Sequence, residues 1–435
     1  MSGQQRSDTP SNAPLPFVSL PDGNIRLLHL RPDRDRDGPL KCQLVDYPLQ
    51  NMGKRACLYE ALSYCWYQSE KPNLVSEKPK WISIDGRRLP ITKNLHDALL
   101  RLRDDFFGRV MWVDAVCINQ GDVEERGHQV RSMTEIYSKA NRVIVWLGEA
   151  EARDHEAFQA IREVGGKLSS LASNKEADDH EASRAEVGET PCPLPRDKEE
   201  AVLQEVAAAQ NLRIMCGAVE MDGYAFSLCV EALPAVRNQA SPVTYLMRPS
   251  IFRPRYKMDH AGRVSLGICP LGGLLDMYHA HEATDPRDKV FAMLGMSSDN
   301  HAAVEIAGLL LNYEILWQDL LKRLVYFVLG QQEVRTQPNQ ETAIIEGKGH
   351  VLGVVHSTDQ NRVRVTPRIS QLPSEWDAQP SVRPIHVGDL VCQLQGATRP
   401  MIIRPHKDHF SVIATTVAAL DAIPRHRSAQ TLESL

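Results

Sequence analysis

The strongest constraint on the fold is the run MWVDAVCINQ at residues 111–120, which sets a carboxylate inside an apolar segment. From Val110 to Ile118 apolar residues occur on both faces of a predicted strand, as is typical of a strand covered on two sides in a parallel sheet. Asp114 interrupts this strand, and burying a carboxylate is costly unless it is paired or hydrogen-bonded. The position therefore requires a structural partner or a functional reason.

Polar residues follow this strand directly. Ligands of open α/β sheets bind beyond the carboxyl ends of the strands, which is where these residues would lie. We therefore expect one cleft edge at the end of this strand. The residues expected to converge there with Asp114 are Asn119, Gln120, Glu125, Arg126 and Gln129.

The surrounding pattern predicts a small three-layer α/β domain. Asp85-Gly86 supplies a type I′ turn between the strands of a hairpin at 81–92. One helix is expected from Asn94 as N-cap to Gly108, and a second has Asp122 as N-cap and Glu125 as its capping-box partner. The strands YEALSYCW, VMWVDAVCI and VIVWL are predicted to be parallel and adjacent in one sheet.

The composition excludes several classes of function. The chain has 435 residues, a net charge of −5 and a pI near 6.3, so it lacks the basic surface of a nucleic-acid-binding protein. Its nine cysteines form no CxxC pair, and His279 and His281 have no third ligand nearby in sequence. We therefore expect no metal, no cofactor, no phosphate-binding glycine loop and a cytoplasmic location. The apolar run 306–330 contains four charged residues and is predicted to be an amphipathic helix rather than a membrane span.

The pattern along the chain divides it into five parts. Residues 1–23 are expected to be a disordered tail, and the α/β domain occupies 24–160. A linker or disordered insertion follows at 161–200, where apolar periodicity is lost. Residues 201–335 are predicted to be helical, with Asp285-Pro286 starting one helix, and 336–435 to be rich in β-strands.

Several of these segments share a family signature. WVDAVCINQ and the run MTEIYSKANRVIVWLG resemble blocks of the fungal heterokaryon incompatibility (HET) domain. YEALSYCW at 59–66 and LPITKNLHDALLRLR at 89–103 resemble two further blocks, in the same order, and ATDPRDKVFAMLGM at 283–296 is similar to a downstream one. Several blocks in the same order are far more specific than one short motif.

The resemblance implies a role in fungal non-self recognition, in which the domain acts as the effector of programmed cell death and has protein partners. HET domains are distantly similar to TIR domains, some of which cleave NAD, so an enzyme that hydrolyses a nucleotide is the alternative. An inactive paralogue that serves as an interaction module is a third possibility.

Each candidate residue has a structural interpretation beside the functional one. Asp114 is either catalytic or a paired structural carboxylate, and Glu125 is either catalytic or a helix cap. Arg126 could form a surface ion pair with Asp122, four residues earlier. Cys117 is interpreted as a core residue. The ligand-binding candidates are Ser63, Tyr64, Asn119, Gln120, Arg126 and Gln129.

Overall fold

The computed structural model divides the chain into two compact units, residues 1–266 and 267–435. The residues that it describes are 17–35, 37–49, 59–64, 79–150, 162, 203–232, 246, 257–258, 264–279, 285–336, 342–359, 362–368, 373–378 and 383–419. The predicted insertion at 161–200 lies almost entirely outside these residues, as does most of the predicted tail.

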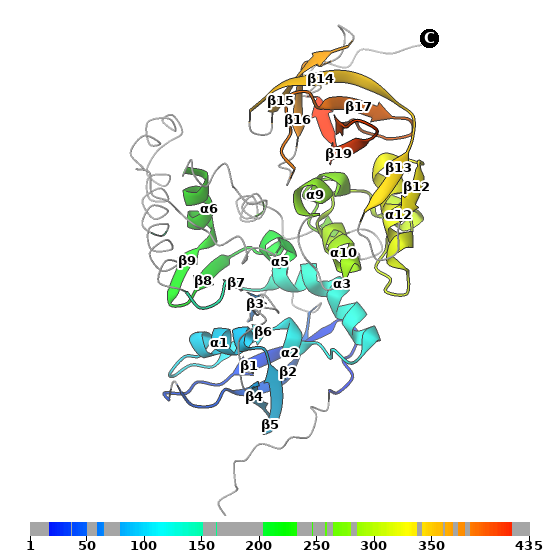
Figure 1. The fold of residues 1–435 in the computed structure, drawn as a ribbon. Coiled ribbons are helices and arrows are strands. Elements are labelled where there is room, and N and C mark those ends of the chain that lie inside the picture. Colours follow the sequence, from blue (N-terminus) through cyan, green and yellow to red (C-terminus); the bar gives the residue numbers. More distant parts are fainter. Residues whose placement is uncertain are drawn as a thin grey trace, which may run out of the picture. The chain divides into compact units, whose positions relative to one another are not determined.

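The first unit is built on a nine-stranded mixed sheet with the order β5-β4-β2-β1-β6-β3-β7-β8-β9 (Figure 1). The strands are β1 (Asn24–Leu30), β2 (Lys41–Pro48), β3 (Glu60–Tyr64), β4 (Lys80–Ile84), β5 (Arg87–Ile91), β6 (Arg109–Trp112), β7 (Arg142–Trp146), β8 (Leu212–Cys216) and β9 (Val219–Asp222). A separate two-stranded sheet pairs β10 (Lys257–Met258) with β11 (Val264–Ser265). The helices are α1 (Lys93–Leu102), α2 (Asp114–Cys117), α3 (Val123–Lys139), α5 (Leu203–Ala208) and α6 (Gly223–Ala232).

The central strands are arranged as the sequence predicts. β3 pairs in parallel with β6 on one side and with β7 on the other. The sheet is larger than predicted, because β1 and β2 extend it on one side and β8 and β9 on the other. The last two strands come from a region whose pattern predicted helices.

Helices cover both faces of the parallel strands, which explains why these strands are apolar throughout. Trp112 shares a face with its register partner Ala61 and packs edge-on against Tyr137 of α3, with ring centroids 5.3 Å apart. Trp146 lies in register with Tyr64, three residues after Ala61, and therefore projects from the opposite face. Its indole Nε1 donates to Asn94 of α1.

Two local predictions near α1 differ in outcome. The hairpin between β4 and β5 is confirmed, since Asp85 and Gly86 both have positive φ, 49° and 80°, as a type I′ turn requires. The predicted N-cap is wrong: Thr92 caps α1 and accepts from the Leu95 amide. Asn94 lies inside the helix, because its side chain is the buried acceptor for Trp146.

Helix α1 also ends at Leu102 rather than at Gly108. The Asp104 carboxylate accepts the backbone amides of Phe106 and Phe107 and forms a turn there. Phe106, which lies inside the predicted helix, is 63% exposed.

The second unit combines four described helices with an antiparallel sheet of order β19-β18-β17-β14-β15-β16-β20. This β-rich end agrees with the prediction. The helices are α9 (Leu271–Tyr278), α10 (Pro286–Met296), α11 (His301–Ile306) and α12 (Trp317–Leu329). The strands are β12 (Glu333–Thr336), β13 (Ala343–Glu346), β14 (Gly349–Asp359), β15 (Arg362–Pro367), β16 (Glu375–Ala378), β17 (Leu390–Leu394), β18 (Met401–Pro405), β19 (Phe410–Ala414) and β20 (Val417–Ala419). β12 and β13 form a separate hairpin.

Side-chain caps start two of these helices, α10 and α11, whereas α9 and α12 begin without one. Asp285 caps α10 by accepting the Arg287 amide, with Pro286 at the first helical position, as predicted. The single helix expected over 306–330 is wrong. Gly308, with φ of 66°, follows the end of α11, and α12 begins only at Trp317. Among the described residues, no helix has the length and apolar character needed to cross a bilayer.

Asp276 of α9 joins this helix to the turn between β19 and β20. Its carboxylate accepts the Thr415 amide at 2.7 and 2.8 Å and the Thr416 amide at 3.2 Å. Burial raises the pKa of Asp276 to about 7, and the hydrogen bonds from Thr415 and Thr416 only partly offset this effect. The folded chain therefore holds a proton here at pH values at which the unfolded chain has released it.

We predict that this group lowers the free energy of unfolding as the pH rises. The unfolded carboxyl titrates near 3.8, so the destabilising contribution develops between about pH 4 and pH 7 and is complete above pH 7. Asp276→Asn keeps an acceptor for Thr415 and should flatten this part of the profile. Urea unfolding of both proteins from pH 4 to 8 measures the difference, and an unchanged slope in Asp276→Asn would contradict the prediction.

Candidate functional site

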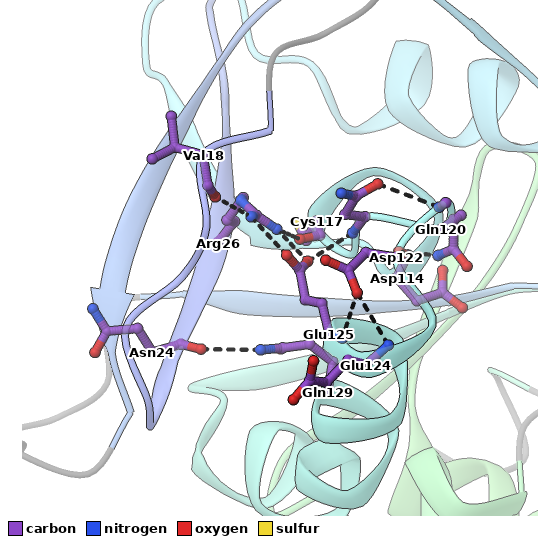
Figure 2. A network of polar contacts seen from close by, with 12 residues as sticks. Val18, Asn24, Arg26, Asp114, Cys117, Gln120, Asp122, Glu124, Glu125 and Gln129 are labelled. Carbon is purple, nitrogen blue, oxygen red and sulfur yellow. Dashed lines mark hydrogen bonds and ion pairs between the residues drawn. The ribbon is translucent and has the colours of Figure 1, made fainter. Parts of the chain in front are cut away.

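The site is organised by Arg26, an arginine in the mostly apolar strand β1. Arg26 is only 3% exposed, so its guanidinium must find hydrogen-bond acceptors inside the protein. Figure 2 shows it between the N-terminal segment, the end of α2 and the first turn of α3. Its contacts are Nη1 to Glu125 Oε1 (2.5 Å), Nη2 to Glu125 Oε2 (2.9 Å), Nη2 to the Val18 carbonyl (2.6 Å) and Nη1 to the Cys117 carbonyl (3.2 Å).

Glu125 is the counter-ion in this arrangement, and it also holds the loop that precedes α3. Its Oε1 accepts the Asn119 amide at 2.8 Å. Asp122 caps α3 as predicted and accepts the amides of Glu124 and Glu125, both at 3.0 Å. The predicted capping box is wrong in one respect, because the Glu125 carboxylate bonds Arg26 and Asn119 rather than the Asp122 amide.

The pairing determines the protonation state of Glu125. Partial burial alone would raise the pKa of its carboxyl, but the hydrogen bonds from Arg26 and Asn119 and the charge of Arg26 together lower it below the ordinary value. Glu125 is therefore ionised at neutral pH. A general acid or base works best with a pKa near the working pH, so this carboxylate is not prepared for proton transfer.

Asp114 lies in the first turn of α2 rather than within a strand, which corrects the prediction. Strand β6 ends at Trp112, and the Val113 carbonyl accepts the amides of Val116 and Cys117, so the chain turns into a helix. The Asp114 carboxylate accepts the Ala115 amide at 2.7 Å, as an acid at a helix N-terminus can. Its backbone carbonyl accepts from Gln120 Nε2 at 3.0 Å.

Ser63 and Tyr64 lie at the carboxyl end of β3, on the sheet edge where ligands of such folds bind. Both are buried. Burial and the neighbouring charge of Asp114 raise the pKa of the Tyr64 phenol well above its ordinary value. The Ser63 hydroxyl and the Trp112 indole N–H are buried without a hydrogen-bond partner among the described residues.

Cys117 is a core residue, as the sequence indicated. It is 1% exposed, and burial raises the pKa of its thiol to about 12. A thiol that stays protonated at neutral pH is a poor nucleophile. Within the described part of the chain, no three His, Cys, Asp or Glu side chains are placed to hold a metal ion.

A cavity of about 370 Å³ lies beside the Arg26–Glu125 pair. It is formed by the segment before β1, the end of β2 and one face of α3. Its lining residues are Ser19, Leu20, Pro21, Asp22, Gly23, Asn24, Ile25, Leu49, Asp122, Glu124, Glu125, His128, Gln129, Ser132 and Glu135.

Two of the candidate residues line this cavity. Glu125 and Gln129 line the cavity, and Gln129 Nε2 donates to the Asn24 carbonyl at 3.0 Å. The other candidates are absent from this lining. They are Ser63, Tyr64, Asp114, Asn119, Gln120 and Arg126, of which Asp114, Tyr64 and Gln120 are linked to one another near the end of β3.

Arg26 and the segment at 18–24 were missed by the sequence analysis. The available signal was Arg26, a charged residue in the mostly apolar run IRLLHL. The same reasoning that singled out Asp114 would have singled out Arg26. Its partner could not have been identified, because Glu125 lies 99 residues further along the chain.

One protein-family model matches part of the first unit. Residues 59–208 match the model of the family described as heterokaryon incompatibility protein (HET). This chain carries a HET domain. The matched range contains β3, the Asp114 turn, α3 and β7, whereas Arg26 precedes it.

A curated relative supports the assignment of the HET domain. Heterokaryon incompatibility protein 6, OR allele, of Neurospora crassa is 33% identical over 171 residues. The aligned part is 38% of this chain and 24% of the relative, so the chain spans about a quarter of that protein. No solved structure matches the chain.

We predict that Glu125→Gln destabilises the HET domain by about 3–5 kcal/mol, because it leaves the buried Arg26 without a counter-ion. The effect should depend on pH. The Glu125 pKa is lowered on folding, so the ion-pair contribution is present above its ordinary value of 4.5 and is lost as the pH falls through the lower folded value.

Glu124→Gln is the matched control, because Glu124 is exposed and forms no ion pair among the described residues. It should change the stability by no more than about 0.5 kcal/mol. Urea unfolding at pH 7 and pH 3.5 measures both variants. Equal stabilities of the two variants at pH 7 would show that the Arg26–Glu125 pair contributes no net stability.

Proposed function

We propose that this chain acts in fungal heterokaryon incompatibility, as a cytoplasmic protein whose HET domain takes part in non-self recognition and triggers cell death through contacts with protein partners. The HET domain match and the incompatibility relative support the role. One observation favours contacts over acid–base chemistry at Glu125: its carboxylate already accepts from Arg26 and from the Asn119 amide.

A catalytic carboxylate and a structural carboxylate need different surroundings. A catalytic acid or base needs a perturbed pKa near neutrality and access to a substrate. Glu125 has a lowered pKa and a side chain that is only 10% exposed. A residue that keeps a helix, a strand and the N-terminal segment in one arrangement contributes to function by preserving the surface that a partner recognises.

We expect growth arrest to follow the amount of folded protein when the full chain is expressed in a fungal host. Glu125→Gln should reduce the arrest only as far as it reduces soluble protein, and growth at lower temperature should restore both. Arg26→Lys keeps the charge and loses the bidentate geometry, so it should behave in the same way. Glu124→Gln should arrest growth as the wild type does.

One result would contradict the contact mechanism. If Glu125→Gln is folded and soluble at the wild-type level and yet causes no arrest, while Arg26→Lys at the same level does, then the Glu125 carboxylate has a chemical role. In that case the contact mechanism is rejected.

A second candidate function is hydrolysis of a nucleotide such as NAD. It is favoured by Asp114, a half-buried carboxylate near the carboxyl ends of β3 and β6. The charge of Asp114 contributes to the raised pKa of the Tyr64 phenol. The purified chain would release nicotinamide from NAD, and Asp114→Asn would abolish the release without unfolding the protein. If wild-type protein releases no nicotinamide, this candidate is eliminated.

A further inference from the structure

The sheet of the first unit has an open face where β2, β4 and β5 form its end. Strand β4 packs against α1. Its buried residues Ile82 and Ile84 alternate with Ser83 and with Trp81, which is 41% exposed. Side chains alternate between the two faces of a strand, so Trp81 and Ser83 project from the face that α1 does not cover.

The register of the strands identifies the neighbours of Trp81 on this open face. Pro90 lies directly opposite Trp81, and Arg88 lies opposite Ser83. Lys41 of β2 lies beside Ser83 on the other side. All three neighbours are exposed, as Trp81 is. We call the four residues Lys41, Trp81, Arg88 and Pro90 the basic face.

The charge on the basic face is positive only. Among the residues of β2, β4 and β5 that project from this side, none is aspartate or glutamate. Neither Lys41 nor Arg88 forms an ion pair among the described residues. Two cations beside an exposed indole and a proline ring fit a partner surface that is both apolar and acidic.

The partner must dock on the face of the sheet rather than along its edge. Strand β5 is the last strand in the order of the sheet, and Pro90 has no N–H to donate to a further strand. Arg88 also places a charge on this last strand, which is one way in which sheets resist edge-to-edge pairing.

The chain itself carries an apolar and acidic surface, at the cavity beside Arg26. Val18 is 72% exposed and Val123 is 64% exposed, and each adjoins a residue of the cavity lining in sequence. The lining contains five carboxylates and no lysine or arginine. Asp22 is one of these carboxylates, and it is exposed and forms no ion pair among the described residues. We call Val18, Asp22 and Val123 the acidic end.

The basic face and the acidic end lie at opposite ends of β2. Lys41 begins this strand, and Leu49, which lines the cavity, directly follows its last residue. At about 3.3 Å per residue, the chain from Lys41 to Leu49 spans about 26 Å. Contact between the two surfaces therefore requires two copies of the chain.

We propose that copies of this chain associate head to tail, with the basic face of one copy docked on the acidic end of the next. The two cations face Asp22, and Trp81 packs on Val18 and Val123. Such a contact uses different surfaces on the two copies, so it adds further copies rather than closing at a dimer. The proposal concerns the assembly of the chain with itself, so it is tested independently of growth arrest and of NAD hydrolysis.

Sedimentation velocity of the full wild-type chain measures this association directly. The average mass should rise as the concentration increases from micromolar to millimolar, and it should pass the mass of a dimer. High salt should reverse the rise, because exposed charges across the contact are screened. Trp81→Ala should weaken the association several-fold and keep its salt dependence, because it removes apolar contact and no charge.

Charge reversal tests the pairing of the two surfaces. Arg88→Glu and Asp22→Lys should each weaken association at least about tenfold, because each places like charges across the contact. An equimolar mixture of the two variants should associate again, since the unchanged basic face of one matches the unchanged acidic end of the other. Lys407→Glu and Glu314→Lys are the matched controls on exposed residues of the second unit, and both should associate as the wild type does.

Three results would overturn the proposal. Wild-type protein that stays monomeric at low ionic strength would leave the basic face to a different protein. A mixture of Arg88→Glu and Asp22→Lys that stays monomeric would mean that the two residues do not face each other; both positions are exposed, and circular dichroism verifies that the variants fold. A mass that levels off at that of a dimer would exclude the head-to-tail arrangement.

Discussion

The first unit depends on burying one positive charge. Arg26 lies in the middle of the nine-stranded sheet, and its guanidinium loses water on folding, so every contact that it makes must compensate for that loss. The acceptors come from three places that are distant in sequence: the carbonyls of Val18 and Cys117 and the carboxylate of Glu125. The pair thereby holds together the N-terminal segment, the turn after β6 and the first turn of α3.

The candidate residues do not all line the cavity beside this pair. Beside the Arg26–Glu125 pair lies an acidic cavity, whose lining includes Asp22, Glu124 and Gln129. Near the carboxyl end of β3 lie Asp114 and Tyr64, where ligands of α/β sheets commonly bind. Glu125, which sequence reasoning counted among the residues of one cleft edge, is the counter-ion of Arg26 and lines the cavity.

The HET domain is also not a self-contained segment of sequence. The family match covers residues 59–208, yet the counter-ion of Glu125 belongs to β1, which lies before that range. Strands β1 and β2 pair antiparallel, and β1 joins the parallel core through β6. A fragment that begins at the matched range would leave Glu125 ionised and partly buried without its partner, so the residues from about 18 onward are part of the folding unit.

The sequence by itself determined the elements that depend on residues close together in the chain. Apolar residues on both faces identified β3, β6 and β7 as neighbouring parallel strands, Asp85-Gly86 identified the hairpin, and Asp122 and Asp285 identified two helix starts. Only the tertiary structure decided that β6 stops at Trp112, that Asn94 serves Trp146 rather than capping α1, and that Glu125 pairs with Arg26. Capping and turn chemistry act over three or four residues and can be read along the chain. The partner of a buried polar group is chosen by which strands and helices come together, and that choice depends on sheet order and register, which no local stretch of sequence contains.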